Sequence, residues 1–277
     1  MKIDLHCHTR ASDGTLTPSD LVARALNQQV EILAITDHDT VAGLAEARQA
    51  AQGSRLQLIS GVEISTRWHS FDIHIIGLNF DPDDVPLNRL LDRHGQWRIS
   101  RAEAIAAKLA KRGIDGTLEQ AMGYADGGSV GRSHFARVLQ ERGLVTAKQA
   151  AFDKYLGRGQ SAYVSNQWCS VAEAIHAIEQ AGGLAVLAHP SKYQLSNKWL
   201  RKLLVEFKVA GGRAMEAIHC QQNTQQRQFL LALAQEYELL ISAGSDFHFP
   251  SRWVELGRGL HRPPQPGVWD HLGWDHQ

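Results

Sequence analysis

The chain has 277 residues, and its 29 Lys and Arg residues balance its 29 Asp and Glu residues. A formal net charge of zero excludes a chain-wide attraction to nucleic acid or membranes, so any polyanion would have to meet a local cationic patch. Three cysteines without a CxxC pair exclude a disulfide framework and fit a reducing compartment. With no signal-like start and no long apolar run, the composition predicts a soluble, cytoplasmic protein without a membrane partner.

Strand and helix patterns alternate along the first third of the chain. Period-two patterns and short apolar runs predict strands at 2–8, 31–36, 56–63 and 71–80. Apolar residues spaced as on one helix face predict helices at 18–29 and 40–52. The first helix has Pro18 at its start, where the fixed φ angle of proline suits the first turn.

The pattern changes beyond this region and then returns. Residues 86–112 are predicted as one long helix and 113–165 as short helical segments without a strand. Helices at 171–181, 197–210 and 223–236 then alternate with strands at 184–188, 214–219 and 239–243. Right-handed crossovers would wind these strands into a barrel-like parallel array of the α/β class. The tail after residue 262 is expected to be an irregular cap, with Trp253, Trp269 and Trp274 as packing residues.

This organisation predicts two structural units. Residues 1–94 and 169–277 would form the barrel, and 95–168 would be a helical insertion near the carboxyl ends of the strands. In a parallel barrel those ends meet on one face, which is where active sites lie.

Side chains that bind metals recur where the predicted strands end. They are His6, His8, Asp13, His38, Glu63, His74, His189, Asp246 and His248. His6 and His8 share one face of the first strand, so both can bind one ion. Cys7 faces the other way and is expected to be a buried structural thiol. A single histidine at a strand end is more often structural, but the joint pattern favours one convergent site.

Nine ligands exceed the need of one ion and suit two or three divalent ions. Glu63 and Asp246 are the expected bridges, because a carboxylate has two oxygens to offer. The mixture of imidazole and carboxylate suits manganese, zinc or iron better than calcium or magnesium. Neighbouring ions of this kind would hydrolyse a phosphate ester by in-line attack of a metal-bound hydroxide.

Six motifs together resemble the PHP family, named for polymerase and histidinol phosphatase. They are Asp4-Leu-His-Cys-His8 with Ser12-Asp-Gly14, Ile35-Thr-Asp-His-Asp39, Gly61-Val-Glu-Ile64, His74-Ile-Ile-Gly77, Ala188-His-Pro190 and Gly244-Ser-Asp-Phe-His248. The resemblance implies a distorted seven-stranded (β/α)7 barrel with a trinuclear site. One ion would be held by His6, His8, Glu63 and Asp246, a second by Glu63, His74 and His189, and a third by Asp13, His38 and His248. The resemblance makes Asp246, Glu63 and His189 the catalytic residues, with manganese as the expected metal and zinc or iron as alternatives.

Within this family the chain is most similar to bacterial 5′-3′ exoribonucleases and 3′,5′-nucleotide bisphosphate phosphatases. The similarity lies in Val130-Gly-Arg-Ser-His-Phe-Ala-Arg137, Lys154-Tyr-Leu-Gly-Arg-Gly159 and Ala214-Met-Glu216. It implies that the insertion covers the metal centre and that Arg132, His134 and Lys154 contact the substrate. The substrate would be short RNA or a nucleoside 3′,5′-bisphosphate, with no obligate protein partner.

Several alternatives stay open at this point. The enzyme could be a small-molecule phosphatase of the histidinol phosphatase kind, although so large an insertion argues against a small monophosphate. The chain could also be a non-catalytic, metal-stabilised module that binds a protein partner, although the complete ligand set argues against this. Tyr163 and Trp168 are candidates either for stacking a base or for packing alone.

Overall fold

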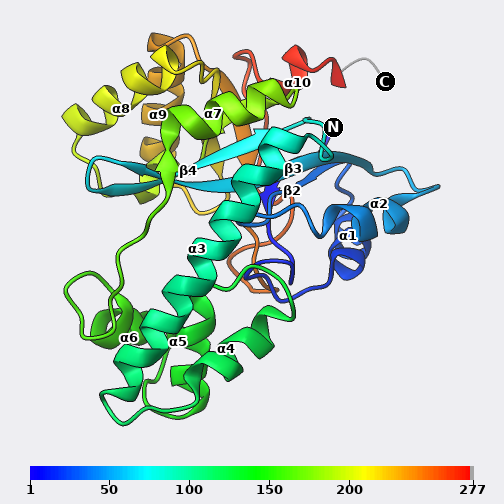
Figure 1. Ribbon diagram of the computed structural model, residues 1–277. Helices are drawn as coiled ribbons and strands as arrows, with labels where there is room; N and C mark the ends of the chain where they lie inside the picture. Colours follow the sequence, from blue (N-terminus) through cyan, green and yellow to red (C-terminus); the bar gives the residue numbers. More distant parts are fainter. Residues whose placement is uncertain (275–277) are drawn as a thin grey trace.

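The computed structural model describes residues 1–274, which form a nearly closed barrel of mixed strands with helices around it (Figure 1). The strands are β1 (Ile3–Cys7), β2 (Ile32–Ile35), β3 (Gln57–Trp68), β4 (Phe71–Leu78), β5 (Cys169–Ser170), β6 (Leu184–Leu187), β7 (Ala214–His219) and β8 (Leu240–Gly244). The sheet runs in the order β1-β2-β3-β4-β6-β7-β8, and β5 pairs with β3. The seven predicted strands are therefore confirmed, and β5 is an addition.

The barrel closes where the chain beyond β8 lies beside β1. The Asp246 amide donates to the His6 carbonyl and the His8 amide donates to the Phe247 carbonyl, both at 2.8 Å. Cys7 is fully buried on the other face of β1, and its thiol lies 3.2 Å from the Ala34 carbonyl. The predicted structural role of this thiol is confirmed.

The prediction that all strands are parallel is wrong at β4. This strand is antiparallel to both β3 and β6. The cause is the length of the preceding connection: only His69 and Ser70 separate β3 from β4, and so short a link can form only a hairpin. His69 adopts a positive φ of 51° in this turn. β3 also continues to Trp68, so Glu63 lies inside a strand and not at its end.

The helices lie close to their predicted positions. They are α1 (Pro18–Asn27), α2 (Leu44–Ala51), α3 (Val85–Ala110), α4 (Thr117–Ala125), α5 (Arg132–Glu141), α6 (Lys148–Ala151), the π-helix η1 (Phe152–Leu156), α7 (Val171–Gln180), the 3-10 helix η2 (Pro190–Lys192), α8 (Asn197–Val209), α9 (Thr224–Glu236) and α10 (Val268–His271). The Thr17 hydroxyl caps α1 by accepting from the Asp20 amide at 3.1 Å. Among residues 1–274, no helix has the length and apolarity needed to cross a membrane.

The helices α4, α5 and α6 gather around the far half of α3, away from the strands (Figure 1). This part of the chain buries a hydrophobic cluster of its own, which includes Ile105, Leu109, Phe135, Val138 and Leu156. Residues 113–165 are helical or irregular, as predicted. The α3 helix runs without a break through the predicted boundary at 94–95 and so joins the two parts.

The three tryptophans of the C-terminal region differ in burial. Trp269 and Trp274 are buried and pack against the barrel core, as predicted. Trp253 is 66% exposed, so the prediction that it packs is wrong. The reason is local: this residue lies in an irregular segment between His248 and Glu255, where the backbone turns outward before Leu256 returns to the core.

Candidate metal centre

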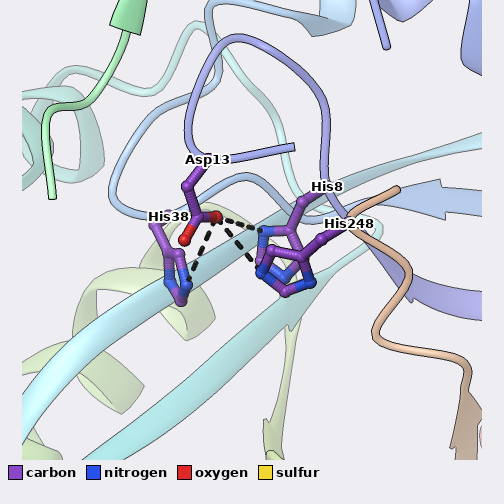
Figure 2. A group of neighbouring side chains, drawn as sticks. All are labelled: His8, Asp13, His38 and His248. Atoms are coloured by element: carbon purple, nitrogen blue, oxygen red, sulfur yellow. Dashed lines mark ion pairs between the residues drawn. The ribbon is translucent and has the colours of Figure 1, made fainter. Parts of the chain in front are cut away.

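The nine predicted ligands lie together at one end of the barrel. They form four groups whose ligand atoms lie within 4.8 Å of one another: His8, Asp13, His38 and His248; His6, Glu63 and His189; His6, His8 and Asp246; and His38, Glu63 and His74. Figure 2 shows the first group, in which three imidazoles surround one carboxylate. Oδ1 of Asp13 lies 3.2 Å from His248, 3.9 Å from His38 and 4.0 Å from His8.

Glu63 lies at the centre of the cluster and contacts ligands on two sides. Its Oε1 lies 2.8 Å from Nδ1 of His74 and 2.9 Å from Nε2 of His189. Its Oε2 lies 3.0 Å from Nδ1 of His38 and 3.3 Å from Nε2 of His8. The two oxygens therefore face different sets of imidazoles, which is the geometry that a bridging carboxylate needs.

Asp246 is oriented differently from Glu63. Its Oδ1 lies 3.2 Å from Nε2 of His8 and 3.4 Å from Nε2 of His6. Its Oδ2 forms an ion pair with Lys192, which sequence reasoning did not single out. Asp246 thus offers one oxygen to the cluster while a lysine holds the other. Lys192 follows the Ala188-His-Pro190 motif by two residues, and this proximity was the available signal.

Two further carboxylates position the ligands. Both oxygens of Glu216 lie near Nδ1 of His6, at 3.1 and 3.2 Å, so that Nε2 faces the cluster. Glu216 also accepts from the His189 amide at 2.7 Å. Asp37 accepts from the Thr9 amide at 2.7 Å and from the Ser12 hydroxyl at 2.6 Å, which fixes the loop that carries Asp13. Such outer carboxylates orient metal ligands in many sites.

Strained backbone marks the same region. Asp39, His189 and Asp246 have positive φ angles of 53°, 26° and 53°, in the region that favours glycine. Each such residue costs about 1–3 kcal/mol and persists only where the surroundings fix it. All three lie within four residues of the end of a barrel strand. The strained backbone therefore lies where the chain leaves the barrel beside the site.

The cluster keeps its carboxylates ionised. Burial by itself would raise the pKa of Asp246, but His6 and Lys192 outweigh this effect and hold the pKa well below its usual range. Burial likewise opposes ionisation of Glu63, yet the imidazoles around it, foremost His38, hold its pKa well below its usual range. Burial lowers the pKa of His38 to about 3, which favours the neutral imidazole. At His6, His8, His74 and His248 the neighbouring carboxylates outweigh burial and raise the pKa, which favours the protonated imidazole. Metals bind ionised carboxylates and neutral imidazoles, so metal binding would displace protons from these four.

The residues present fit divalent ions. Four of the nine predicted ligands have a buried atom without a hydrogen-bond partner: Asp13 Oδ1, His38 Nδ1, Glu63 Oε2 and His189 Nδ1. Nε2 of His6 and Nε2 of His8 lie only 3.2 Å apart. Lone pairs that converge in this way without donors are explained by a cation between them. A cluster of imidazole and carboxylate ligands can bind metal here, as the sequence predicted.

A small pocket of about 170 Å³ adjoins the cluster and contains one predicted substrate residue. His38 and His74 line it from the barrel side, and Arg132 lines it from α5. The Arg132 guanidinium donates to Asn166 at 2.8 Å and lies 5.2 Å from the Tyr163 ring. Its Nε is buried and has no hydrogen-bond partner.

The other two predicted substrate residues lie elsewhere. His134 is buried, and its Nδ1 accepts from the Gly131 amide at 2.9 Å, which caps the start of α5. Lys154 is exposed on η1, with its ammonium 5.0 Å from the Tyr155 ring. Contacts of these two side chains with a substrate stay predictions.

Two arginines of the pocket were not anticipated. Arg98 and Arg101 lie three residues apart on α3, and both line the pocket beside Arg132. Arg98 donates to Asp39 at 2.8 Å, and Arg101 donates to Asn166 at 2.6 Å. Their spacing places them on one helix face, but the apolar stripe of α3 dominated its interpretation. Three guanidinium groups beside a metal cluster suit an anion such as phosphate.

Trp168 is not free to stack a base. His94 stacks on its ring with centroids 5.3 Å apart, and the guanidinium groups of Arg98 and Arg101 lie 5.1 and 4.7 Å from it. Of the two interpretations left open for this residue, packing is the one realised.

Comparison with known proteins decides the family. A model of the PHP domain matches residues 4–236. The chain belongs to the PHP domain family. The 5′-3′ exoribonuclease Rnm of Escherichia coli (strain K12) is 49% identical over 269 residues, covering 96% of this chain and 92% of that protein. The 3′,5′-nucleoside bisphosphate phosphatase of Chromobacterium violaceum is 39% identical over 264 residues, covering 95% and 93%.

A solved structure shares the fold of this chain. A protein of Chromobacterium violaceum, described as an amidohydrolase with bound sulfate and no metal, superposes with a TM-score of 0.93 at 37% identity and covers 99% of this chain and 96% of its own. The chain is thus a PHP enzyme that hydrolyses phosphoric esters. The relatives favour nucleotide chemistry over a histidinol phosphatase and over a non-catalytic module.

Proposed function

We propose that this PHP enzyme removes nucleotides from the 5′ ends of short RNA, or the 3′ phosphate from nucleoside 3′,5′-bisphosphates, with two or three divalent ions. Manganese is the first candidate, because the mixture of imidazole and carboxylate suits it; zinc and iron are the alternatives. We place this activity in the cytoplasm. The observation that carries the proposal is the arginine pocket beside the ligand cluster.

The pocket explains why the substrate would be a nucleotide and not a small monophosphate. Arg98, Arg101 and Arg132 line the pocket in which His38 and His74 of the cluster also appear. A substrate with one phosphate at the cluster and a second at the arginines would use both features. RNA 5′ ends and nucleoside 3′,5′-bisphosphates carry two such phosphates, whereas a simple monoester carries one.

The chain's own residues have separable roles in this chemistry. When bound, divalent ions would polarise the ester and activate water for in-line attack. Glu63 would bridge ions through its two oxygens, while Asp246 and His189 would each offer one ligand atom. Glu216 would hold His6 with Nε2 toward the cluster. Arg132 would bind the non-reacting phosphate with its guanidinium, which lines the pocket beside the cluster.

A substrate panel tests the proposal. Purified enzyme with manganese would be offered 5′-phosphorylated short RNA, DNA of the same sequence, adenosine 3′,5′-bisphosphate and histidinol phosphate, with products separated by chromatography. We expect turnover of RNA or of the bisphosphate, and little of histidinol phosphate. Preferred hydrolysis of histidinol phosphate would refute the proposal. Elemental analysis of the same preparation should find two or three ions per chain.

A further inference from the structure

A second, larger hollow begins at the metal cluster and leads away from the arginine pocket. It has a volume of about 760 Å³ and lies between the loop after β1 and helix α5. Asp13 and Ser133 line both hollows, so the two meet at these residues. The Ser133 hydroxyl donates to Oδ2 of Asp13 at 2.7 Å and marks the junction. We refer to this second hollow as the exit groove.

Three cationic side chains line the exit groove, together with the carboxylates of Asp13 and Glu141. Arg10, Arg137 and Lys148 line it, and they come from the barrel loop, α5 and α6. Arg137 is partly neutralised by Glu141 at 2.7 Å, and Arg10 lies 3.7 Å from Asp126. Lys148 has no ion pair within residues 1–274, so its charge faces the groove.

An exposed aromatic ring lies next to a cation of the groove. The Lys148 ammonium lies 5.5 Å from the ring of Phe249, which is 49% exposed and directly follows the candidate ligand His248. The Thr15 amide donates to the His248 carbonyl at 2.8 Å, which ties the groove wall to this segment. In the same irregular segment of the chain, Trp253 is also exposed and has the Arg252 guanidinium 4.7 Å from its ring.

Cations interleaved with exposed aromatic rings are typical of surfaces that bind single-stranded nucleic acid. The cations track the phosphates, and the rings stack on unpaired bases without selecting their sequence.

We propose that the exit groove, with Phe249 and Trp253, binds the single-stranded RNA that continues on the 3′ side of the scissile phosphate. The inference rests on the proposed function, and it separates the two substrates. The 5′-terminal phosphate occupies the arginine pocket, the scissile ester lies at the cluster, and the remaining RNA leaves along the groove. A nucleoside 3′,5′-bisphosphate has no such continuation and does not use the groove.

Charge reversal in the groove tests this directly. Lys148→Glu should lower kcat/KM about tenfold for a 5′-phosphorylated RNA of about ten nucleotides, because it places a carboxylate beside the RNA phosphates. Turnover of adenosine 3′,5′-bisphosphate should stay within about twofold. The salt dependence of RNA turnover should also become shallower, since one cation is lost.

A second variant addresses stacking without changing charge. Phe249→Ala should again lower kcat/KM for RNA by about tenfold and leave the bisphosphate within about twofold. Lys198→Glu is the matched control, because Lys198 is an exposed lysine on α8, away from the groove. It should affect neither substrate. Melting temperatures of all three variants should equal that of the wild type.

The possible outcomes test the role of the groove separately from the proposed function. Equal losses on both substrates, or no loss on either in both variants, would overturn the role of the groove. A wild-type enzyme that hydrolyses a generic phosphate ester but neither nucleotide substrate would refute the proposed function itself, and the groove inference with it.

Discussion

At the scale of single residues, Asp246 has an unusual backbone angle and contacts different partners through its two carboxylate oxygens. It adopts a left-handed φ of 53°, offers Oδ1 toward His8 and holds Lys192 with Oδ2. Glu63 is also central, yet it lies in regular strand and contacts five imidazoles. The two carboxylates predicted as equivalent bridges are therefore different: Glu63 has bridging geometry, and Asp246 offers the cluster one oxygen.

Substituting Asp246 separates catalysis from folding. Asp246→Asn keeps the size and removes the charge that the cluster needs, so turnover of p-nitrophenyl phosphate should fall by several powers of ten. Circular dichroism should report an unchanged fold. Asp92→Asn, an exposed carboxylate on α3, is the control. Activity within about threefold of wild type, less than 1 kcal/mol of barrier, would show that Asp246 is not a ligand.

Replacing Arg132 tests whether its guanidinium binds a phosphate of the substrate. Arg132→Ala should lower kcat/KM for RNA or bisphosphate by roughly 10–1000-fold, about 1.4–4 kcal/mol, because a guanidinium–phosphate contact is lost. The effect on p-nitrophenyl phosphate should be small, and metal content should not change. The exposed Arg112→Ala serves as control. An equal loss on every substrate would instead assign Arg132 a structural role.

At the scale of elements, the site depends on how closely β8 approaches β1 and β7. A Cβ atom at Gly244, the last residue of β8, would lie 2.2 Å from Cβ of His6 and 2.3 Å from Oε1 of Glu216. His6 is a predicted ligand of the cluster, and Glu216 orients its ring. The glycine is thus required by close packing of strands at the metal centre, not by its backbone angles.

A methyl group at this point should disturb stability and metal binding together. Gly244→Ala should lower the free energy of unfolding by about 1–3 kcal/mol through overpacking, as measured by urea denaturation. Elemental analysis should find less metal per chain. Gly123→Ala on α4 has open space for its Cβ and should stabilise by about 0.5–1 kcal/mol. Unchanged stability and metal content in Gly244→Ala would contradict this account.

At the scale of the whole molecule, residues 1–274 form three hydrophobic clusters, two in the barrel and one in the helical part. The barrel has its own core, and the helical part is packed around residues such as Phe135. We propose that the division into 1–94 with 169–277 and 95–168 describes these two parts, although α3 belongs to both. The arginine pocket and the exit groove are lined from both parts, so their relative position determines the substrate site.

Metal should stabilise the whole fold, because the buried carboxylates and imidazoles come from strands on all sides of the barrel. The melting temperature should rise with manganese concentration and fall after chelation, since an ion that binds only the folded state shifts the equilibrium by mass action. Scanning fluorimetry over a manganese series measures this. Asp246→Asn should show a smaller rise. A melting temperature independent of manganese and chelator would exclude a metal that stabilises the barrel.

The sequence by itself determined the strands, the helices and the identities of the clustered side chains. Strand and helix patterns depend on local periodicity, and β1 with its histidines, α3 and β6 lie close to where that periodicity predicts them. The joint occurrence of His-x-His, Asp-His-Asp and Asp-x-His also predicted one convergent site. These features needed no knowledge of contacts, because each is a property of a short segment.

Only the tertiary structure decided which partners these residues meet. The reversal of β4 follows from a two-residue turn, yet its position in the sheet depends on pairing with β6, more than a hundred residues away along the chain. Lys192 lies beside Asp246, and Arg98 and Arg101 lie beside Arg132, although these partners are distant in sequence. The motif next to Lys192 and the spacing of the two arginines mark the residues but do not identify their partners. Side-chain partners of this kind are fixed by packing of whole elements, and no local pattern encodes them.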